Sequence, residues 1–507
     1  MFICIKRLII LLFSVLSVTC FGDESSIKGR FVVKYTNTIL TKQQAQTNFT
    51  KIYMANLIKT KRGLDIRING RAKETIGSTI VSETIAILPD DYHGITPKVV
   101  VKEGDEVKAG SPVFYDKTFD TMNFVSPVSG KVLAVNRGER RKVLSITIQS
   151  DKKNTYQSFD VKPVEKLNRE ELRELLLKSG LWVYIKQRPY DIIANPTKPA
   201  KAIFISAFDS APLAPNHEFV VAGEMKEFQL GIDALSKLTD GKVHLGVKAG
   251  VNSVFSSVKN VEITSYEGPH PAGNVGVQIN HIDPVNKGEA VWTINAQDVL
   301  FIGRFFSKGI VDLKRTLALT GPEVAEPQYY QTIAGSSVAE IVKGKVSSNE
   351  ELRYINGNVL SGAQVGLDGY LSPYATQISV IKEGRDQHEL IGWAMPRFNK
   401  FSASRIYFTG ILQKVFGKKD FEFDARLLGG RRAIIMSGEY DRVLPMDILP
   451  EFLIKAMIAG NIDKMEALGA YEIAPEDVAL CEFVCTSKLP LQEIVRTALD
   501  KMKLEIE

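Results

Sequence analysis

One stretch of the chain, SYEGPHPAGNVGVQINHIDPV at residues 265–285, is rich in glycine and raises the question of a phosphate-binding loop. Gly268 and Gly273 have the offset of the two glycines in a Walker A loop, but Asn274 stands where that loop needs its phosphate-binding lysine. Gly273 and Gly276 match only the end of a dinucleotide-binding G-x-G-x-x-G pattern, and no helix clearly begins there. The spacing therefore argues against a nucleotide-binding loop.

The prolines and histidines of the same stretch weaken the phosphate hypothesis further and form no complete metal site. Pro269 and Pro271 lack the backbone N–H groups that such a loop would offer to phosphate. His270 and His281 are not accompanied by the cysteine or carboxylate cluster that a zinc site requires. Asp283 could orient the His281 imidazole, but no serine or cysteine nucleophile is tied to this pair in sequence. We expect structural histidines here, with a metal site as the alternative.

Two cysteines near the carboxy terminus, Cys481 and Cys485, form a C-x-x-x-C pair. Two thiolates alone fill neither a tetrahedral zinc site nor an iron–sulfur cluster. At this spacing they fit one helix face as small core residues, and the alternative is a half-site that another chain completes. Only Cys4 and Cys20 remain, so the chain has no disulfide framework and its cysteine usage suits a reducing compartment.

Composition and charge exclude several function classes. The chain has 507 residues, of which 44% are hydrophobic and 24% charged, and a net charge of +6. This is an ordinary globular composition, and the length predicts about three domains. The basic clusters at 59–67, 137–142 and 429–432 are not interleaved with aromatic residues, as a nucleic-acid groove would require. We interpret them as solvated faces, with an anionic lipid surface or an acidic partner as the alternative. No complete hydrolase, kinase or metalloprotease signature is present.

The amino terminus resembles a signal peptide, with Lys6 and Arg7 preceding an apolar run at 8–18 that is too short to span a bilayer. A basic, alternating segment that looks like the start of a folded domain follows Met54. We therefore expect residues 1–53 to be an upstream extension and the working protein to begin at Met54.

The elements that would position these residues begin with a β-rich domain at 54–150. Alternating strands with glycine turns at 97–116 and 123–148 predict a small barrel-sandwich that resembles biotinyl and lipoyl carrier domains. Such carriers attach their cofactor to a lysine at a hairpin tip. Lys117 occupies that region without the usual flanking methionine, so we expect the architecture without the swinging arm.

Residues 151–325 alternate strands and helices, which predicts a Rossmann-like α/β domain with a parallel sheet. A helix is expected from Asn168, whose capping box pairs it with Glu171, to Gly180. Apolar runs at 201–208, 242–248 and 260–266 predict strands, and a helix is expected at 223–241.

Two further domains are expected after the α/β domain. Residues 326–395 predict a β-grasp domain of the soluble-ligand-binding (SLBB) type, with a glycine-rich hairpin at 351–365 and a closing strand at 389–393. Residues 396–507 are predicted to be mainly helical.

From residue 54 onward the chain resembles, along its whole length, the family of A subunits of the sodium-translocating NADH:quinone oxidoreductase. Seven ordered strings carry the resemblance: KRGLDIRINGRA, VVVKEGDEVKAGSPVFYDK, FVSPVSGKVLAVNRGERR, LWVYIKQRPYDI, GPHPAGNVGVQINHIDPV, VWTINAQDVLFIGRFF and APEDVALCEFVC. The family begins where Met54 stands, which agrees with the expected start.

The resemblance implies a peripheral, cofactor-poor subunit on the cytoplasmic side of the inner membrane. Its partners would be the other subunits of a six-subunit complex, which hold the flavins and the iron–sulfur centre and export sodium while quinone is reduced. Without a spanning segment after residue 54, this chain cannot itself conduct sodium. Quinone is the expected substrate, and no tightly bound cofactor is expected in this chain.

The resemblance also gives the glycine-rich stretch a role. We expect GPHPAGNVG to form a rigid loop at the edge of the α/β layer that faces quinone or a partner, through Gly268, His270, Pro271, Gly273 and Gly276. No catalytic residue and no metal ligand are expected, apart from the cysteine pair as a weak candidate for a site between subunits.

A more distant resemblance, to the flavin subunit of complex I and the C subunit of the Rnf complex, leaves an alternative open. Those proteins share the α/β layer, the β-grasp insert and the helical tail, but carry a glycine-rich flavin loop where this chain has KQRPYDIIANP. They also carry full cysteine sets, of which only Cys481 and Cys485 remain here. The alternatives are thus a stand-alone flavin or iron–sulfur oxidoreductase and an exported ligand-binding protein.

Overall fold

A computed structural model describes residues 56–250, 253–346, 350–385, 400–403, 407–410 and 419–506, and the backbone of two short strands, 32–35 and 38–41. The chain divides into two compact units, Met1–Leu57 and Ile58–Glu507. In the first unit, β1 (Val32–Tyr35) pairs antiparallel with β2 (Thr38–Thr41). The signal-like segment and the expected closing strand at 389–393 lie outside the described residues.

A β-sandwich opens the second unit. One sheet has the order β5-β11-β10-β7 and the other the order β6-β8-β9. The predicted turns at Gly104 and Gly110 have φ of +92° and +94°, which glycine adopts without strain. Phe114 and Phe124 stack in its core with ring centroids 4.4 Å apart. The bounds are β5 (Thr84–Ile87), β6 (Pro97–Val99), β7 (Glu106–Val107), β8 (Pro112–Asp116), β9 (Asn123–Val125), β10 (Gly130–Arg137) and β11 (Val143–Ser150).

A seven-stranded sheet follows, with the order β13-β12-β17-β14-β15-β16-β3. The strands β17, β14, β15 and β16 lie next to one another in that order and run parallel. Strand β12 pairs antiparallel with β17. Both faces of a parallel sheet are covered by other elements, so its strands are apolar on both sides. The continuous apolar runs in the sequence agree with this. The bounds are β3 (Leu57–Lys59), β12 (Lys186–Arg188), β13 (Ile192–Ile193), β14 (Ile203–Ser206), β15 (Val243–Lys248), β16 (Glu262–Glu267) and β17 (Val291–Asn295).

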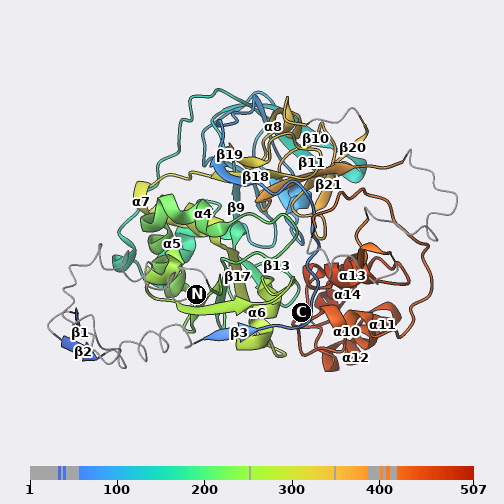
Figure 1. Ribbon diagram of the computed structural model, residues 1–507. Coiled ribbons are helices and arrows are strands. Elements are labelled where there is room, and N and C mark those ends of the chain that lie inside the picture. The colour runs from blue at the N-terminus through green and yellow to red at the C-terminus, as the bar shows by residue number, and fades with distance from the viewer. Residues whose placement is uncertain are drawn as a thin grey trace, which may run out of the picture. The chain divides into compact units, whose positions relative to one another are not determined.

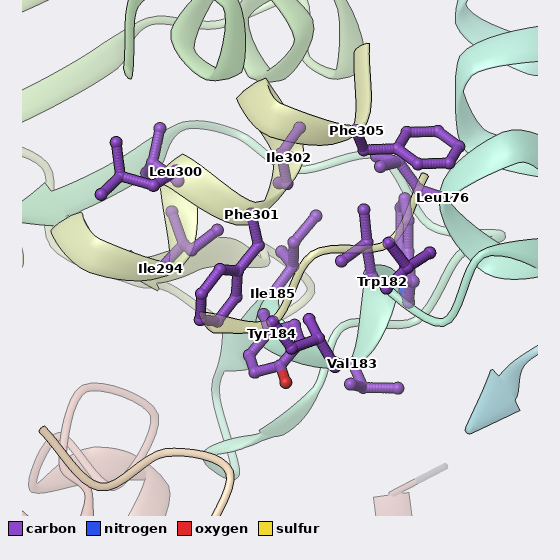
Figure 2. Packing of buried hydrophobic residues seen from close by; sticks show 14 of the residues in the cluster. Leu176, Trp182, Val183, Tyr184, Ile185, Ile294, Leu300, Phe301, Ile302 and Phe305 are labelled. Carbon is purple, nitrogen blue, oxygen red and sulfur yellow. The ribbon is translucent and has the colours of Figure 1, made fainter. Parts of the chain in front are cut away.

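Helices α5 (Met225–Leu238) and α7 (Ala296–Lys308) lie side by side in this domain (Figure 1). Their close approach depends on two glycines. A Cβ on Gly231 of α5 would collide with Val299 of α7, and one on Gly303 of α7 would collide with the Glu227 carbonyl. Beneath α7, Tyr184 and Trp182 pack against its buried side chains, and Tyr184 meets Phe301 edge to face at 5.1 Å (Figure 2).

The remaining helices of the α/β domain are short. The predicted helix at 168–180 is α3 (Arg169–Lys178), and the capping box between Asn168 and Glu171 is present. The others are α4 (His217–Val221) and α6 (Val275–Ile282). Helix α6 corrects the expectation that no helix begins after Asn274.

A six-stranded sheet with the order β21-β20-β22-β18-β19-β4 forms the β-grasp part of the chain. It takes β4 (Lys73–Ile76) from far upstream and β18 (Lys314–Thr320) from before residue 326. The predicted hairpin is the antiparallel pair β20 (Leu352–Asn356) and β21 (Ala363–Val365). The remaining elements are β19 (Gln328–Ile333), α8 (Val338–Val342) and β22 (Gln377–Lys382).

Helices dominate the described residues after 438, and they gather around one apolar core (Figure 1). Their bounds are α10 (Glu439–Val443), α11 (Pro450–Ala459), α12 (Ile462–Ala467), α13 (Ala479–Val484) and α14 (Leu491–Ile506). None of the helices in the described part of the chain is both long enough and apolar enough to span a bilayer.

Candidate functional site

A cavity of about 260 Å³ lies at the carboxyl ends of the parallel strands β14 and β17. Strand β14 pairs with β15, the next strand of the chain, on one side and with β17 on the other side. The strand order therefore reverses between β14 and β17. Ligands of open α/β sheets bind at this kind of reversal. The wall contains Tyr184, Lys186, Arg188, Asp191, Ser206, Asp209, Ala211, His217, His270, Gly273, Asn274, Val275, Thr293, Ile294, Asn295, Asp298, Asn358, Leu360, Ser361, Tyr374, Glu476 and Ala479.

Two of the five predicted loop residues, His270 and Gly273, line this cavity. They lie between β16 and α6, in the segment that was predicted to form a rigid loop. Gly268, Pro271 and Gly276 are not among the lining residues. Gly268 has φ of +155° and packs against Thr60, so its role is to let two backbone segments approach.

His270 is held in one orientation by a hydroxyl relay. The Gly273 N–H donates to the Ser210 Oγ at 2.8 Å, and this hydroxyl lies 3.1 Å from His270 Nδ1. Because Oγ already accepts from Gly273, its proton is free to be donated to Nδ1, which requires a neutral imidazole. Burial lowers the pKa of His270 to about 4, against the opposing charges of Asp209 and Asp65. The imidazole is therefore neutral at physiological pH.

Gly273 and Gly276 are both sites of close approach. A Cβ on Gly273 would lie 2.5 Å from the Phe208 carbonyl oxygen and from the Ser210 nitrogen. A Cβ on Gly276 would collide with the carboxylate of Asp477. The two glycines therefore let α6 begin against β14 on one side and against the carboxy-terminal helices on the other.

His217 supplies a buried polar atom that lacks a partner. It is the first residue of α4, lines the cavity and is only 4% exposed. Its Nδ1 makes no hydrogen bond to any described residue. Burial lowers its pKa, with Asp209 acting in the opposite direction, so this imidazole is also neutral at physiological pH. An unsatisfied buried nitrogen beside a cavity is a feature that a bound ligand would satisfy.

The opposite wall is charged and joins the α/β sheet to the carboxy-terminal helices. Arg188 is 1% exposed, bonds the buried Asp477 carboxylate and donates to Glu476 at 2.7 Å. Burial raises the pKa of Glu476 to about 7, although Arg188 opposes this. Burial also acts against ionisation of Asp191, but Lys186 and Arg188 hold its pKa below the usual range. This wall can therefore bind or release a proton near neutral pH through Glu476.

A second buried ion pair supports the floor. Asp298, in the first turn of α7, accepts from Arg315 of β18 at 2.6 Å, and both side chains are buried. Arg315 also donates to the carbonyls of Pro373 and Ala375. Burial raises the pKa of Asp298 to about 6, while Arg315 acts to lower it. The pair fixes α7 against the six-stranded sheet and against the segment that carries Tyr374.

The two histidines of the sequence motif are not brought together as a metal site. His281 is exposed, and its Nδ1 lies 2.8 Å from the Val277 carbonyl within α6. Asp283 pairs with Lys201 at 2.6 Å and not with His281. In the part of the chain that the structure describes, no group of three or more histidine, cysteine or acidic side chains is arranged to bind a metal.

Both thiols of the cysteine pair are buried and reduced. Cys481 lies in α13, and Cys485 caps the end of the same helix. The Tyr440 hydroxyl lies 2.9 Å from Cys485 Sγ, and burial raises the pKa of the Cys481 thiol well above its usual range. Since both side chains lie among apolar neighbours, the pair fits the structural-core interpretation.

Sequence reasoning missed His217, Asp209 and the Asn358–Ser361 turn. The signal that could have found the first two is their position after the predicted strand at 201–208, at the carboxyl edge of the sheet. The turn comes from the β-grasp hairpin, and no local pattern indicates that it reaches the α/β domain. Four of the seven family strings, by contrast, supply cavity residues.

Family models match three parts of the chain. Residues 58–151 match the NqrA N-terminal barrel-sandwich hybrid domain, residues 167–311 the NqrA second alpha/beta domain, and residues 316–366 the NQRA C-terminal domain of SLBB type. The predicted barrel-sandwich, α/β and SLBB-type folds are thereby confirmed.

Curated relatives cover most of the chain. It is 38% identical over 454 residues to the A subunit of the Na(+)-translocating NADH-quinone reductase of Serratia proteamaculans, covering 89% of this chain and 100% of the relative. It is 37% identical over 452 residues to the corresponding protein of Pasteurella multocida, with the same coverage. A solved NAD+-reducing [NiFe]-hydrogenase gives a TM-score of only 0.34 at 10% identity, covering 68% of this chain and 64% of that chain, which is too low to support an argument.

Proposed function

The chain belongs to the family of A subunits of the Na(+)-translocating NADH-quinone reductase, and we propose that it is the peripheral subunit that binds the quinone headgroup. In this proposal the flavins, the iron–sulfur centre and the sodium path belong to partner subunits, and this chain sits on the cytoplasmic side of the membrane. Of the predicted loop residues Gly268, His270, Pro271, Gly273 and Gly276, His270 and Gly273 contribute to one wall of the quinone site.

The observation that carries the proposal is the unpartnered Nδ1 of buried His217 in a cavity at the strand-order reversal. A quinone carbonyl is a hydrogen-bond acceptor, and a neutral imidazole with its proton on Nδ1 is a matching donor. Because the pKa of His217 is lowered, this donor stays uncharged while a neutral quinone binds.

The rest of the cavity suits a headgroup and not a long isoprenoid tail. Its volume of about 260 Å³ lies near the lower end of the ~300 to 1,000 Å³ of ligand pockets. Tyr184, Ile294 and Tyr374 offer ring-sized apolar surfaces, and Glu476, with a pKa of about 7, is a group that can deliver a proton. The four central parallel strands also support a Rossmann-like description of the domain around it.

A direct test is calorimetric titration of the chain with a short-chain, water-soluble ubiquinone analogue. We expect saturable binding that weakens about tenfold in His217→Ala, since a hydrogen bond of ~1 to 1.5 kcal/mol is lost. His281→Ala, which removes an exposed histidine outside the cavity, is the matched control and should bind like the unmodified chain. Absence of saturable binding, or equal weakening by both variants, would contradict the quinone site.

Membership of a membrane complex is tested separately. A tagged chain beginning at Met54 should recover hydrophobic partner subunits from membranes under mild detergent. Recovery of the free monomer would contradict the role as a peripheral subunit, whatever the result with quinone.

A further inference from the structure

A run of exposed apolar side chains lies in the carboxy-terminal part of the chain. Residues 427–436, which we name the strap, have no regular secondary structure. Leu427, Leu428 and Ile435 are 60%, 56% and 58% exposed. On the neighbouring helix α11, Phe452 is 54% exposed. Apolar side chains this exposed and this close in sequence are typical of a surface that contacts another phase or partner.

Basic side chains lie between these apolar ones. Arg431 and Arg432 are exposed in the middle of the strap, and the Lys488 side chain passes beside Gly429. None of the three has an acidic partner among the described residues. The strap therefore presents positive charge that forms no ion pair with the residues that the structure describes.

The acidic groups nearest in sequence are already engaged. Asp424 binds Arg426 and Lys400, and Glu439 binds Arg442. Glu451 is buried and accepts the N–H groups of the segment that follows the strap. These three acidic groups therefore do not pair with Arg431 or Arg432.

The strap is nevertheless held in place by its backbone. The Arg432 N–H donates to the Ser487 carbonyl at 2.8 Å, and the Ser487 hydroxyl donates to the Ala433 carbonyl at 2.9 Å. At its end, the N–H groups of Ser437 and Gly438 donate to Glu451 at 3.0 and 2.7 Å. These bonds place Ile435 and Met436 near the first turn of α11, where Phe452 is exposed.

We propose that the strap, with Phe452 and Lys488, docks on the headgroup region of an anionic lipid bilayer. Cations of this kind bind lipid phosphates, while flanking leucine, isoleucine and phenylalanine side chains reach the boundary with the acyl chains. An acidic protein surface would satisfy the arginines, but it would leave the apolar tips on either side of them without a matching apolar layer. The surface is separate from the quinone cavity, so either proposal can fail alone.

The test measures partitioning of the protein onto phosphatidylcholine vesicles with and without phosphatidylglycerol. The unmodified chain should bind the anionic vesicles and lose that binding as salt is raised. Arg431→Gln with Arg432→Gln should lower the partition coefficient about 30-fold, from ~1 kcal/mol for each basic residue at a tenfold change per 1.4 kcal/mol. Leu427→Ser with Leu428→Ser should lower the part of vesicle binding that remains at high salt, because that part depends on apolar contacts.

The matched control is Arg140→Gln with Arg141→Gln, a pair of exposed arginines on the β10–β11 turn beside exposed Leu144, which should bind like the unmodified chain. All variants are compared in the full chain and in a chain beginning at Met54, so that lipid affinity of residues 8–18 does not mask the effect. Thermal unfolding confirms that each variant is folded.

Binding of the double arginine variant equal to that of the unmodified Met54 chain would overturn the proposal. No binding to anionic vesicles by the unmodified Met54 chain would overturn it as well. If the strap variants then lost recovery of membrane subunits, the strap would be a protein interface and not a lipid one.

Discussion

Two sequence motifs carry residues capable of chemistry, and the fold places them in opposite surroundings. The loop at 268–276 reaches a polar cavity where His217 has a nitrogen without a partner and where charges face each other. The cysteine pair lies in a closed apolar core, where Tyr440 occupies the space beside Cys485. His270, Gly273 and Gly276 of the loop are buried, as are both cysteines, so burial by itself does not distinguish the two motifs.

The difference lies in what each motif leaves unsatisfied. In the wall of the cavity, an imidazole nitrogen of His217 and a guanidinium nitrogen of Arg188 have no hydrogen-bond partner among the described residues. Such groups cost free energy unless something binds them, so their persistence indicates a site. Around the cysteines, the Tyr440 hydroxyl pairs with Cys485 Sγ, and the Cys481 thiol donates to the Tyr440 backbone carbonyl. Each of the following predictions tests that contrast.

The largest effect is expected from Asp477→Asn. This change leaves the buried Arg188 charge without its nearest counter-charge, and unfolding should become easier by about 3 kcal/mol. Glu476→Gln is the control, because the new amide oxygen can still accept the Arg188 hydrogen bond and Asp477 still neutralises the guanidinium, so we expect a loss below about 1 kcal/mol. Denaturant unfolding measures the free energy of unfolding of both variants. Equal losses in the two variants would contradict a dominant contribution of the buried Arg188–Asp477 pair.

The next effect depends on pH. Burial lowers the pKa of His270 to about 4 from 6.5, so the unfolded chain binds more protons between these values. The free energy of unfolding should therefore fall as pH drops from 6.5 to 4, by up to about 3 kcal/mol from this residue. His270→Asn should reduce that slope without abolishing it, because the pKa of His217 is also lowered. An unchanged slope in urea unfolding at several pH values would contradict the buried, neutral His270.

Gly273→Ala should have an intermediate effect. The new Cβ would press on the backbone at Phe208 and Ser210, which costs about 2 kcal/mol and disturbs the relay to His270. Gly223→Ala is the control, since nothing lies within 4 Å of its added Cβ. The unfolding temperature and the quinone affinity should both fall in Gly273→Ala. Neither should change in Gly223→Ala. If Gly273→Ala retained full stability and quinone affinity, the loop would not be closely packed against the cavity.

The smallest effect is expected from Cys481→Ala. Removing a buried thiol from an apolar core costs about 1 kcal/mol, and quinone affinity and assembly with partner subunits should not change. Calorimetry of unfolding and co-purification measure the two properties. Loss of assembly at retained stability would revive the half-site alternative.

Local signals predicted local structure well. The capping box of Asn168 and Glu171 and the hairpin at 351–365 depend on neighbours in sequence, and both are present. The start of α6 was missed because the Asn274 side chain does not cap the helix and instead donates to the Glu476 carbonyl.

The cavity could not be predicted from local patterns. Its residues come from segments as distant as Lys186, His217, Asn358 and Glu476, and only the folded sheet brings them together. The pairing of β4 with β19 is a similar long-range event. The family strings located much of the cavity wall, whereas His217 lay outside all of them and was not found.

The most direct test of the quinone site is the KM for quinone in the assembled complex. NADH-driven quinone reduction should be measured in membranes that contain either the unmodified protein or His217→Ala, with Cys481→Ala as the control. We predict about a tenfold rise in KM for quinone with His217→Ala, an unchanged kcat, and no change in either constant with Cys481→Ala. An unchanged KM in His217→Ala would contradict the proposal that this cavity binds the quinone headgroup.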